Sequence, residues 1–331
     1  MWPVILMSAG TSGLMADDDS GGHDDRMSTG GYESWFVSAR DPASARALWI
    51  RHTWLGSGQG PRSAALWCTV VDRGLSRQPV VVKQVFSSFP PGAAAGPGLF
   101  RGEAAMAGQD ARWELAITGG QGPVRPLRPA VLYRAPLPRT KLEASVPDGL
   151  ITGMLEVNGH RVGVDQWRGT VGHNWGTDHA DRWVWLHAAG FGATPQAWLE
   201  LVLAKIKIGP ARSPWTAIGA FSLGRRTVPL GGLGRRPLVQ AGPGRLTAVI
   251  PSPRARLKVT VTAGDDDAVA VAYTDPAGGT RAVRHAAVAT VKLAWHHRGD
   301  SELTLSSDRG AYEYGTSQGM PGITLQPLPE G

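Results

Sequence analysis

The sequence predicts an all-β protein of two tandem antiparallel β-barrels, and three observations support this fold class. Short segments rich in β-branched and aromatic residues recur from Tyr32 onward, separated by turns of Gly, Pro and Asp. Helical periodicity is weak, and only residues 42–48 have the composition of a single helical turn. Strands without alternating helices exclude a doubly wound parallel fold and favour barrels or sandwiches.

The strands are expected in two sets of about eight, one on each side of a His-Asn-Trp segment at residues 173–175. Because an eight-stranded barrel encloses just enough space for a small ligand, two packed barrels would also leave a cleft between them. In the first set we expect strands at residues 32–37, 47–55, 64–71, 80–87, 112–118, 130–134, 152–157 and 161–165. In the second set we expect strands at residues 183–190, 197–208, 216–223, 245–250, 256–262, 268–273, 288–295 and 302–307.

The chain divides into three predicted parts. Residues 1–28 are rich in Asp, Gly and Ser and show no periodicity, so we expect a disordered leader there. The two strand sets then assign residues 29–178 to the first barrel and residues 179–331 to the second. The length of 331 residues is enough for two domains of roughly 100–200 residues each, and a hydrophobic content of 42% is typical of proteins with a packed core.

Several features predict a cytoplasmic protein. No apolar run reaches the roughly 18–20 residues that span a bilayer. The apolar segment 1–7 is too short for a signal peptide, lacks a basic start and leads into the acidic residues 17–19. Cys68 is the only cysteine, so it can form no disulfide within the chain, which fits a reducing compartment. Its apolar neighbours predict a buried thiol rather than a nucleophile.

The net charge of +7 and the isoelectric point of about 9.9 raise the question of an anionic partner. The basic residues are mostly arginines and are scattered, with small clusters at residues 225–226 and 235–236. Nucleic-acid binding uses clustered Lys and Arg to neutralise phosphates, so we expect no nucleic-acid partner. A peripheral contact with an anionic membrane surface stays open. The sequence does not define an oligomeric state.

Residues 172–187 have the composition of a binding or catalytic site. The run Gly-His-Asn-Trp-Gly at residues 172–176 combines side chains that can move a proton with an aromatic ring and flanking glycines. Asn174 is one of only two asparagines in the chain. Further Asp, His and Trp side chains follow within residues 178–187. We therefore expect this region to form more than a core.

Four motifs together carry a family resemblance. They are Gly-Tyr-Glu-Ser-Trp-Phe at 31–36, Ala-Leu-Trp-Ile-Arg at 47–51, Val-Asn-Gly at 157–159 and Gly-His-Asn-Trp-Gly at 172–176. In these motifs the chain resembles the two-domain lipocalin-like superfamily of carotenoid 1,2-hydratases (hydroxyneurosporene synthases), which includes tocopherol-cyclase-like, fungal Diels–Alderase-like and AttH-type members. The resemblance covers the chain from about residue 30 to its end.

The resemblance implies two lipocalin-like barrels and a bulky hydrophobic small molecule, an isoprenoid, polyene or polyketide, bound near their interface. Members of the superfamily catalyse different reactions. The resemblance therefore implies the fold and the ligand class better than the chemistry. Hydratase-type members usually carry an Asp directly before His-Asn-Trp, where this chain has Gly172. The acid of the hydratases therefore has no counterpart at this position.

The chemistry of such ligands indicates which residues could act. Protonation of an alkene requires an acid that an apolar surround keeps protonated near neutral pH, and Glu33 and Asp178 fit this requirement. A pericyclic reaction needs only a shaped cavity and a donor such as His173 or Asn174. The predicted catalytic residues are therefore Glu33, His173, Asn174 and Asp178. Aromatic rings that could wall the pocket complete the site, and the predicted ligand-binding residues are Trp35, Trp49, Trp175, Trp183, Trp185 and His187.

Structural roles remain as alternatives for these residues. Glu33 could be exposed or paired within a strand, and Trp35 could belong to a core. His173 and Asn174 could close the connection between the barrels and satisfy buried backbone groups.

No metal or cofactor is expected. The glycine-rich residues 231–234 precede no helix and lack dinucleotide or P-loop spacing. The segment Gly-Thr-Ser-Gln-Gly at 315–319 matches a hydrolase motif, but no histidine follows it. The four residues that a metal site would need match no zinc spacing. They are His173, Asp178, His179 and His187.

The leading functional hypothesis is a cofactor-independent cyclase, isomerase or hydratase acting on such a hydrophobic ligand. The alternative is a non-catalytic lipid or hydrophobic-metabolite binding protein. An enzyme of this kind requires an acid with a raised pKa against the ligand pocket, whereas a carrier needs no ionisable group at the base of its pocket.

Overall fold

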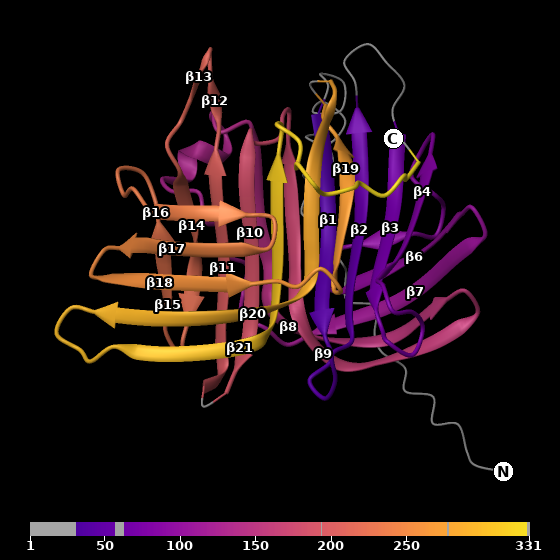
Figure 1. Ribbon diagram of the computed structural model, residues 1–331, viewed down its shortest axis with the longest axis horizontal. Helices are drawn as coiled ribbons and strands as arrows, with labels where there is room; N and C mark the ends of the chain where they lie inside the picture. The colour runs from indigo at the N-terminus through magenta and orange to yellow at the C-terminus, as the bar shows by residue number, and fades with distance from the viewer. Residues whose placement is uncertain (1–30, 57–62, 193, 277, 330–331) are drawn as a thin grey trace, which may run out of the picture.

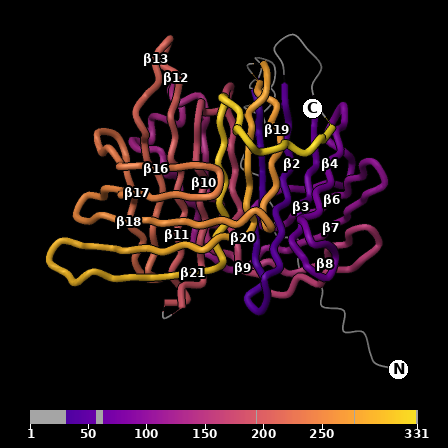
Figure 2. The backbone as a smooth tube through the Cα atoms, viewed as in Figure 1, coloured from indigo at the N-terminus to yellow at the C-terminus, as the bar shows by residue number. Residues whose placement is uncertain are grey.

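The computed structural model describes residues 31–56, 63–192, 194–276 and 278–329, so the predicted leader at 1–28 lies outside the described residues. Two curled antiparallel sheets stand side by side, one from each half of the chain (Figure 1). The backbone tube shows the same division (Figure 2). Each sheet curls around its own hydrophobic core as an open half-barrel. The predicted all-β, lipocalin-like fold class is confirmed.

The first sheet contains the nine strands between residues 31 and 176. They are β1 (Gly31–Arg40), β2 (Ala47–Gly56), β3 (Ser63–Val71), β4 (Val80–Phe86), β5 (Ala94–Ala95), β6 (Leu99–Met106), β7 (Gln109–Thr118), β8 (Thr140–Val157) and β9 (His160–Gly176). Their order in the sheet is β4-β3-β2-β1-β9-β8-β7-β6-β5. The end strands β4 and β5 are not hydrogen-bonded to each other, so this half-barrel stays open.

The second sheet contains ten strands of the C-terminal half. They are β10 (Arg182–Phe191), β11 (Thr194–Lys205), β14 (Thr216–Ser222), β15 (Thr227–Gly231), β16 (Leu238–Gly242), β17 (Arg245–Ser252), β18 (Ala255–Thr262), β19 (Ala268–Thr274), β20 (Thr280–His297) and β21 (Leu303–Thr316). The order is β15-β14-β11-β10-β21-β20-β18-β17-β16, and β19 pairs with β20. A small hairpin of β12 (Lys207–Ile208) and β13 (Ala211–Arg212) projects beside β14.

The chain passes from the first sheet to the second within a short connection. β9 ends at Gly176 and β10 begins at Arg182. The boundary expected at residues 178–179 falls in this connection, and the division of the chain into domains there stays a prediction. The His-Asn-Trp segment itself lies inside β9, because its pairing with both β1 and β8 continues to Gly176.

Two segments differ from the structure expected from the sequence, and several strands were not predicted. The strand predicted at 130–134 is wrong, because Ala130–Tyr133 form a short 3-10 helix, η1. Four prolines lie within residues 126–138, and a proline cannot donate to a strand ladder. The helical turn expected at 42–48 is replaced by a bend before β2. Strands β6, β15 and β16 were not predicted, because their Gly, Ala and Pro residues have low β-propensity. Within the described residues, no helix is long and apolar enough to cross a membrane.

Strand alternation places the side chains of β1 in two different hydrophobic clusters. Val37 and Ala39 of β1 pack in the core of the first half-barrel, where Cys68 is buried as predicted. Burial raises the pKa of the Cys68 thiol. Phe36, on the opposite face of β1, packs against residues of the second sheet. Arg40 shares that face and donates from Nε to the carbonyl oxygen of Ala287 at 2.9 Å. Both faces of β1 are therefore buried.

Candidate functional site between the two sheets

A cavity of about 510 Å³ lies where the outer faces of the two sheets meet. Pockets for small organic ligands have volumes of roughly 300–1,000 Å³, so this cavity has the size of a ligand site. Buried aromatic side chains from both sheets line it. They are Tyr32, Phe36 and Trp49 from the first sheet and Trp183, Trp185 and Tyr273 from the second.

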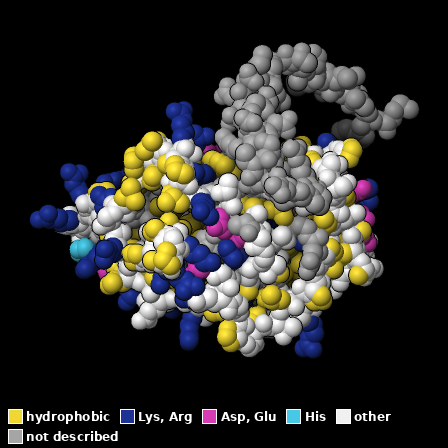
Figure 3. Space-filling model, turned by 90° about the horizontal axis from the view of Figure 1, so that it is seen from above, with side chains coloured by type: hydrophobic (Ala, Val, Ile, Leu, Met, Phe, Trp, Pro, Cys, Tyr) yellow, Lys and Arg dark blue, Asp and Glu magenta, His cyan; other side chains and the backbone are white. Residues whose placement is uncertain are grey.

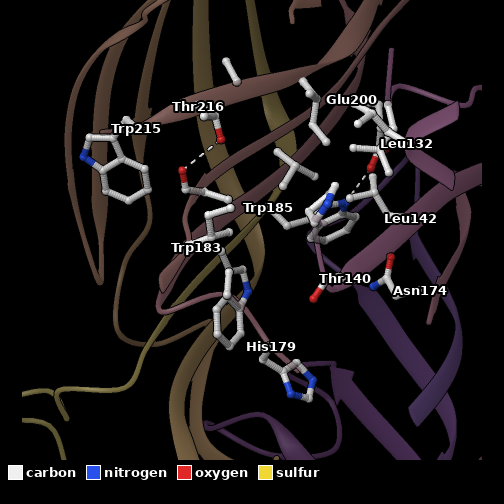
Figure 4. A pocket seen from close by; sticks show the side chains of 18 of the residues that line it. Leu132, Thr140, Leu142, Asn174, His179, Trp183, Trp185, Glu200, Trp215 and Thr216 are labelled. Atoms are coloured by element: carbon white, nitrogen blue, oxygen red, sulfur yellow. Dashed lines mark hydrogen bonds between the residues drawn. The ribbon is translucent and has the colours of Figure 1, made fainter. Parts of the chain in front are cut away.

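Two tryptophans of β10 hold two carboxyl groups in this cavity. Trp183 and Trp185 are two residues apart, so both side chains face the same side of the sheet. The indole Nε1 of Trp183 donates to Oε1 of Glu313 on β21 at 2.8 Å, and that of Trp185 donates to Oε1 of Glu200 on β11. Figure 4 shows Trp183, Trp185 and Glu200 around the cavity. The two acids thus flank β10 from its two neighbouring strands.

Glu200 is protonated at neutral pH. Only 5% of the residue is exposed, and burial raises its pKa to about 8, although the hydrogen bond from Trp185 and the charge of Arg40 act in the opposite direction. Its Oε2 forms no hydrogen bond of good geometry among the described residues, but the Thr170 hydroxyl is a polar neighbour of the carboxyl group and also acts to lower its pKa. A carboxylic acid with a pKa close to the working pH is well suited to donate a proton.

Glu313 has the opposite environment. The Tyr273 hydroxyl donates to its Oε2 at 2.9 Å, and Nδ1 of His285 lies 3.4 Å from the same oxygen. Burial acts to raise the pKa of Glu313, but His285, Trp183 and Arg51 stabilise the carboxylate and lower the pKa overall. When two carboxyl groups have different environments, their pKa values differ. The group with the raised pKa can then act as the acid and the other as the base. The two carboxyl groups beside β10 therefore differ in charge, one neutral and one ionised, while the third acid that lines the cavity, Glu143, forms an ion pair with Arg125.

A further polar group closes the cavity near the connection between the sheets. The His179 ring stacks on Tyr32 with ring centroids 4.3 Å apart, and both side chains line the cavity. Burial lowers the pKa of His179 and raises the pKa of Tyr32 to about 12. Both side chains are therefore uncharged near neutral pH and can only exchange hydrogen bonds with a ligand.

Four of the predicted site residues line the cavity. They are Asn174, Trp49, Trp183 and Trp185. Asn174 projects from β9 beside Thr140 of β8 (Figure 4).

Four other predicted residues lie together on the opposite face of β1 and β9. Nε2 of His173 is 2.8 Å from Oε1 of Glu33, and Nε1 of Trp35 donates to the same oxygen at 3.1 Å. The His173 ring stacks between Trp35 and Trp175, with ring centroids 4.0 Å and 4.5 Å away. Trp35 packs against the core of the first half-barrel. The structure thus brings Glu33, Trp35, His173 and Trp175 into one cluster, but none of them lines the cavity.

The remaining two predicted residues lie beside the cavity without lining it. Asp178 forms ion pairs with Arg281 at 3.2 Å and Arg139 at 3.4 Å. Nε2 of His187 lies 3.0 Å from the carbonyl oxygen of Pro147, and burial lowers the pKa of His187 to about 3. Across the described ranges, no group of three or more His, Cys, Asp or Glu side chains is arranged to hold a metal ion.

Four residues that line the cavity were not predicted as site residues: Arg51, Glu200, Tyr273 and Glu313. A signal for the two acids exists in the sequence. Glu200 is the only charged residue of the apolar segment 197–203, and Glu313 stands between two tyrosines. A lone acid in a strand whose apolar residues occupy both faces is a candidate for burial, and a buried acid needs a partner or a raised pKa.

Phe36 occupies the space that a side chain at Gly172 would need. A Cβ atom there would lie 2.2 Å from Cζ of Phe36. Because Gly172 and Asn174 share one face of β9, an aspartate at 172 would project toward the second sheet. The Phe36 ring fills the position that such an aspartate would occupy. The neutral acid of this cavity is instead Glu200, on the facing sheet.

The fold and the cavity define the class of this protein: a lipocalin-like protein of two half-barrels with a ligand-sized cavity between them. The AttH-type protein NE1406 of Nitrosomonas europaea has a similar structure, with a TM-score of 0.51, 13% identity and coverage of 93% of this chain and 98% of that chain. The structure of CghA matches with a TM-score of 0.51, 14% identity and coverage of 87% and 88%. The resemblance predicted from the motifs is confirmed for the fold.

Two further proteins show weaker similarity. Kievitone hydratase from Nectria haematococca aligns with a TM-score of 0.48 and 11% identity over 88% of this chain and 90% of that chain. An uncharacterized protein of Mycobacterium tuberculosis, Rv0493c in strain H37Rv and MT0513 in strain CDC 1551, is 27% identical over 175 residues, 49% of this chain and 50% of the relative. The chain thus spans about half the length of the curated relatives it matches. No family model matches the chain.

Proposed function

We propose that this protein is a cofactor-independent hydratase, cyclase or isomerase that protonates an alkene of a bulky isoprenoid, polyene or polyketide held between the two sheets. One observation carries the proposal: Glu200 and Glu313 face the same aromatic cavity from the two strands that flank β10. A carrier of apolar ligands gains nothing from such groups, because burying an ionisable side chain costs stability.

One of the two acids can donate a proton to the ligand, and the other can remove a proton from it. Glu200 donates its proton to one carbon of the double bond, which leaves a positive charge on the other carbon. In a hydration, water adds to this carbocation and transfers its extra proton to the carboxylate of Glu313. In a cyclisation or isomerisation, Glu313 takes a proton from a carbon next to the cation. The charge of the cavity is the same before and after the reaction, which suits an apolar site.

The aromatic walls support the cationic intermediate. Trp49, Trp183 and Trp185 line the cavity, and the face of each ring stabilises a nearby cation by about 0.5–2 kcal/mol. Asn174 supplies an amide that can donate to a ligand oxygen. The ligand class follows from the motif resemblance and from the mostly apolar lining. The compartment expected from the sequence, the cytoplasm, remains part of this proposal.

The test is proton incorporation from solvent. The protein is incubated in D2O with a panel of isoprenoids, polyenes and linear polyketides, and products are analysed by mass spectrometry for one carbon-bound deuterium. We expect Glu200→Gln, which keeps the size of the side chain but removes the acidic proton, to lower turnover by about 10²–10⁴, the usual contribution of general acid catalysis.

The competing acid is tested in the same assay. If Glu33→Gln lowers turnover and Glu200→Gln does not, the acid lies in the cluster on β1 and the proposal is wrong. Tight binding of panel members without deuterium incorporation would favour the binding-protein alternative.

A further inference from the structure

The mouth of the cavity is formed by three segments, residues 125–139, 205–215 and 231–236, which we call the rim. The side chains that line the cavity and are also exposed show where it opens to solvent. Those on the rim include Arg128, Leu137, Pro214, Leu233, Arg235 and Arg236.

The rim concentrates the positive charge of the protein. It contains nine Lys and Arg residues and no Asp or Glu, whereas the net charge of the whole chain is +7. The rest of the chain therefore has no positive surplus. Only three of the nine form ion pairs with acidic side chains of the described residues. They are Arg125 with Glu143, Arg139 with Asp178, and Arg212 with Asp181.

The rim also exposes large apolar side chains. Seven large hydrophobic side chains stand out as exposed in the described part of the chain, and four of them belong to the rim. They are Val131, Leu137, Ile208 and Leu233, with exposures of 63%, 43%, 52% and 69%. Figure 3 looks onto the end of the molecule where β12 and β13 project, and it shows hydrophobic and basic side chains gathered on the same side.

We propose that the rim docks onto the surface of an anionic lipid bilayer and places the mouth of the cavity against the lipids. Basic side chains are attracted to anionic head groups, and exposed apolar side chains enter the boundary between head groups and acyl chains. An apolar ligand then passes between bilayer and cavity without crossing water. A nucleic acid would match the positive charge but would leave the exposed Val, Ile and Leu side chains in water. The proposal concerns ligand supply and does not depend on the chemistry of Glu200.

Vesicle co-sedimentation of the full chain tests the proposal. We expect binding to phosphatidylcholine vesicles that contain phosphatidylglycerol, weaker binding at high salt and much weaker binding to pure phosphatidylcholine. The double variant Arg235→Ser/Arg236→Ser should bind about thirtyfold more weakly, since each basic residue near the surface contributes roughly a fivefold factor. Leu233→Ser should weaken binding without changing its salt dependence.

A matched control lies in the preceding turn of the chain, at the other end of β15. Arg225→Ser/Arg226→Ser removes the same two charges from the turn between β14 and β15, away from the rim, and should bind vesicles nearly as well as the parent protein. Equal weakening by the two double variants, or no binding to anionic vesicles, overturns the proposal. Binding to duplex DNA that depends on Arg235 and Arg236, without vesicle binding, overturns it as well. Thermal unfolding confirms that each variant is folded. Glu200→Gln should bind vesicles like the parent protein. A failure of the proposed chemistry can therefore be distinguished from a failure of membrane binding.

Discussion

Trp185 on β10 donates its indole N–H to Oε1 of Glu200 on β11, while Oε2 of that carboxyl group has no partner of good geometry among the described residues. An indole can only donate, so it leaves the proton of a neutral carboxyl group free to reside on the other oxygen. The acid is therefore held in place mainly through Oε1, and the Thr170 hydroxyl is a further polar neighbour of the carboxyl group. This arrangement yields predictions that need no knowledge of the substrate.

Glu200→Gln should remove a pH dependence of stability. The carboxyl group ionises near pH 4.5 in the unfolded chain but near pH 8 in the folded protein. Between these pH values the unfolded state has lost a proton that the native state keeps. The free energy of unfolding therefore falls by a few kcal/mol as the pH rises from about 4.5 to about 8, and is level above that. Urea unfolding at a series of pH values measures this slope, which the glutamine variant should lack. Parallel profiles of the two proteins would show that Glu200 is ionised in the native state.

Trp185→Phe should raise the pKa of Glu200 further, because it removes a hydrogen bond that stabilises the carboxylate. A hydrogen bond to a charged group contributes about 1.5–3 kcal/mol, so the falling part of the stability profile should extend to higher pH by about one to two pH units. Trp183→Phe is the matched control. It removes the donor to Glu313 and should leave the alkaline end of the profile near pH 8. An equal extension in both variants would contradict the assignment.

Gly172→Ala should destabilise the protein by about 1–3 kcal/mol, the usual cost of overpacking a core. The new methyl group would overlap the Phe36 ring. Gly163→Ala is the control on the same strand, because a Cβ atom there meets nothing within 4 Å. Its effect should stay within about 0.5 kcal/mol. The comparison is made by urea unfolding, and equal effects of the two variants would show that Phe36 does not fill this space.

Asn174→Ala should alter ligand binding rather than stability. Its side chain lines the cavity and is only half-buried. The free energy of unfolding should therefore change by less than about 0.5 kcal/mol, while the affinity for a hydrophobic fluorescent probe changes. A loss of about 1–3 kcal/mol with unchanged probe affinity would instead assign Asn174 to the scaffold.

The sequence by itself determined the fold class. Segments such as 197–208 and 256–262 are rich in Leu, Val or Ile and are followed within two residues by a glycine, and a chain with this pattern buries its side chains best as antiparallel strands. The same reasoning failed at 130–134, where the apolar residues favour a strand but neighbouring prolines remove the donors that a strand needs. Local chemistry thus explains both the strands that were predicted and the one that was wrong.

Only the tertiary structure decided which acid faces the cavity. Glu33 on β1 and Glu200 on β11 are both acids among buried neighbours. In a sheet with one solvent-exposed face, the alternation of apolar and polar residues along a strand shows which side chains point into the core. These two strands are buried on both faces, because the outer faces of the sheets pack together, so alternation does not show which face meets a ligand. That choice depends on contacts between distant parts of the chain, such as Phe36 against Trp185, whose ring centroids are 5.1 Å apart.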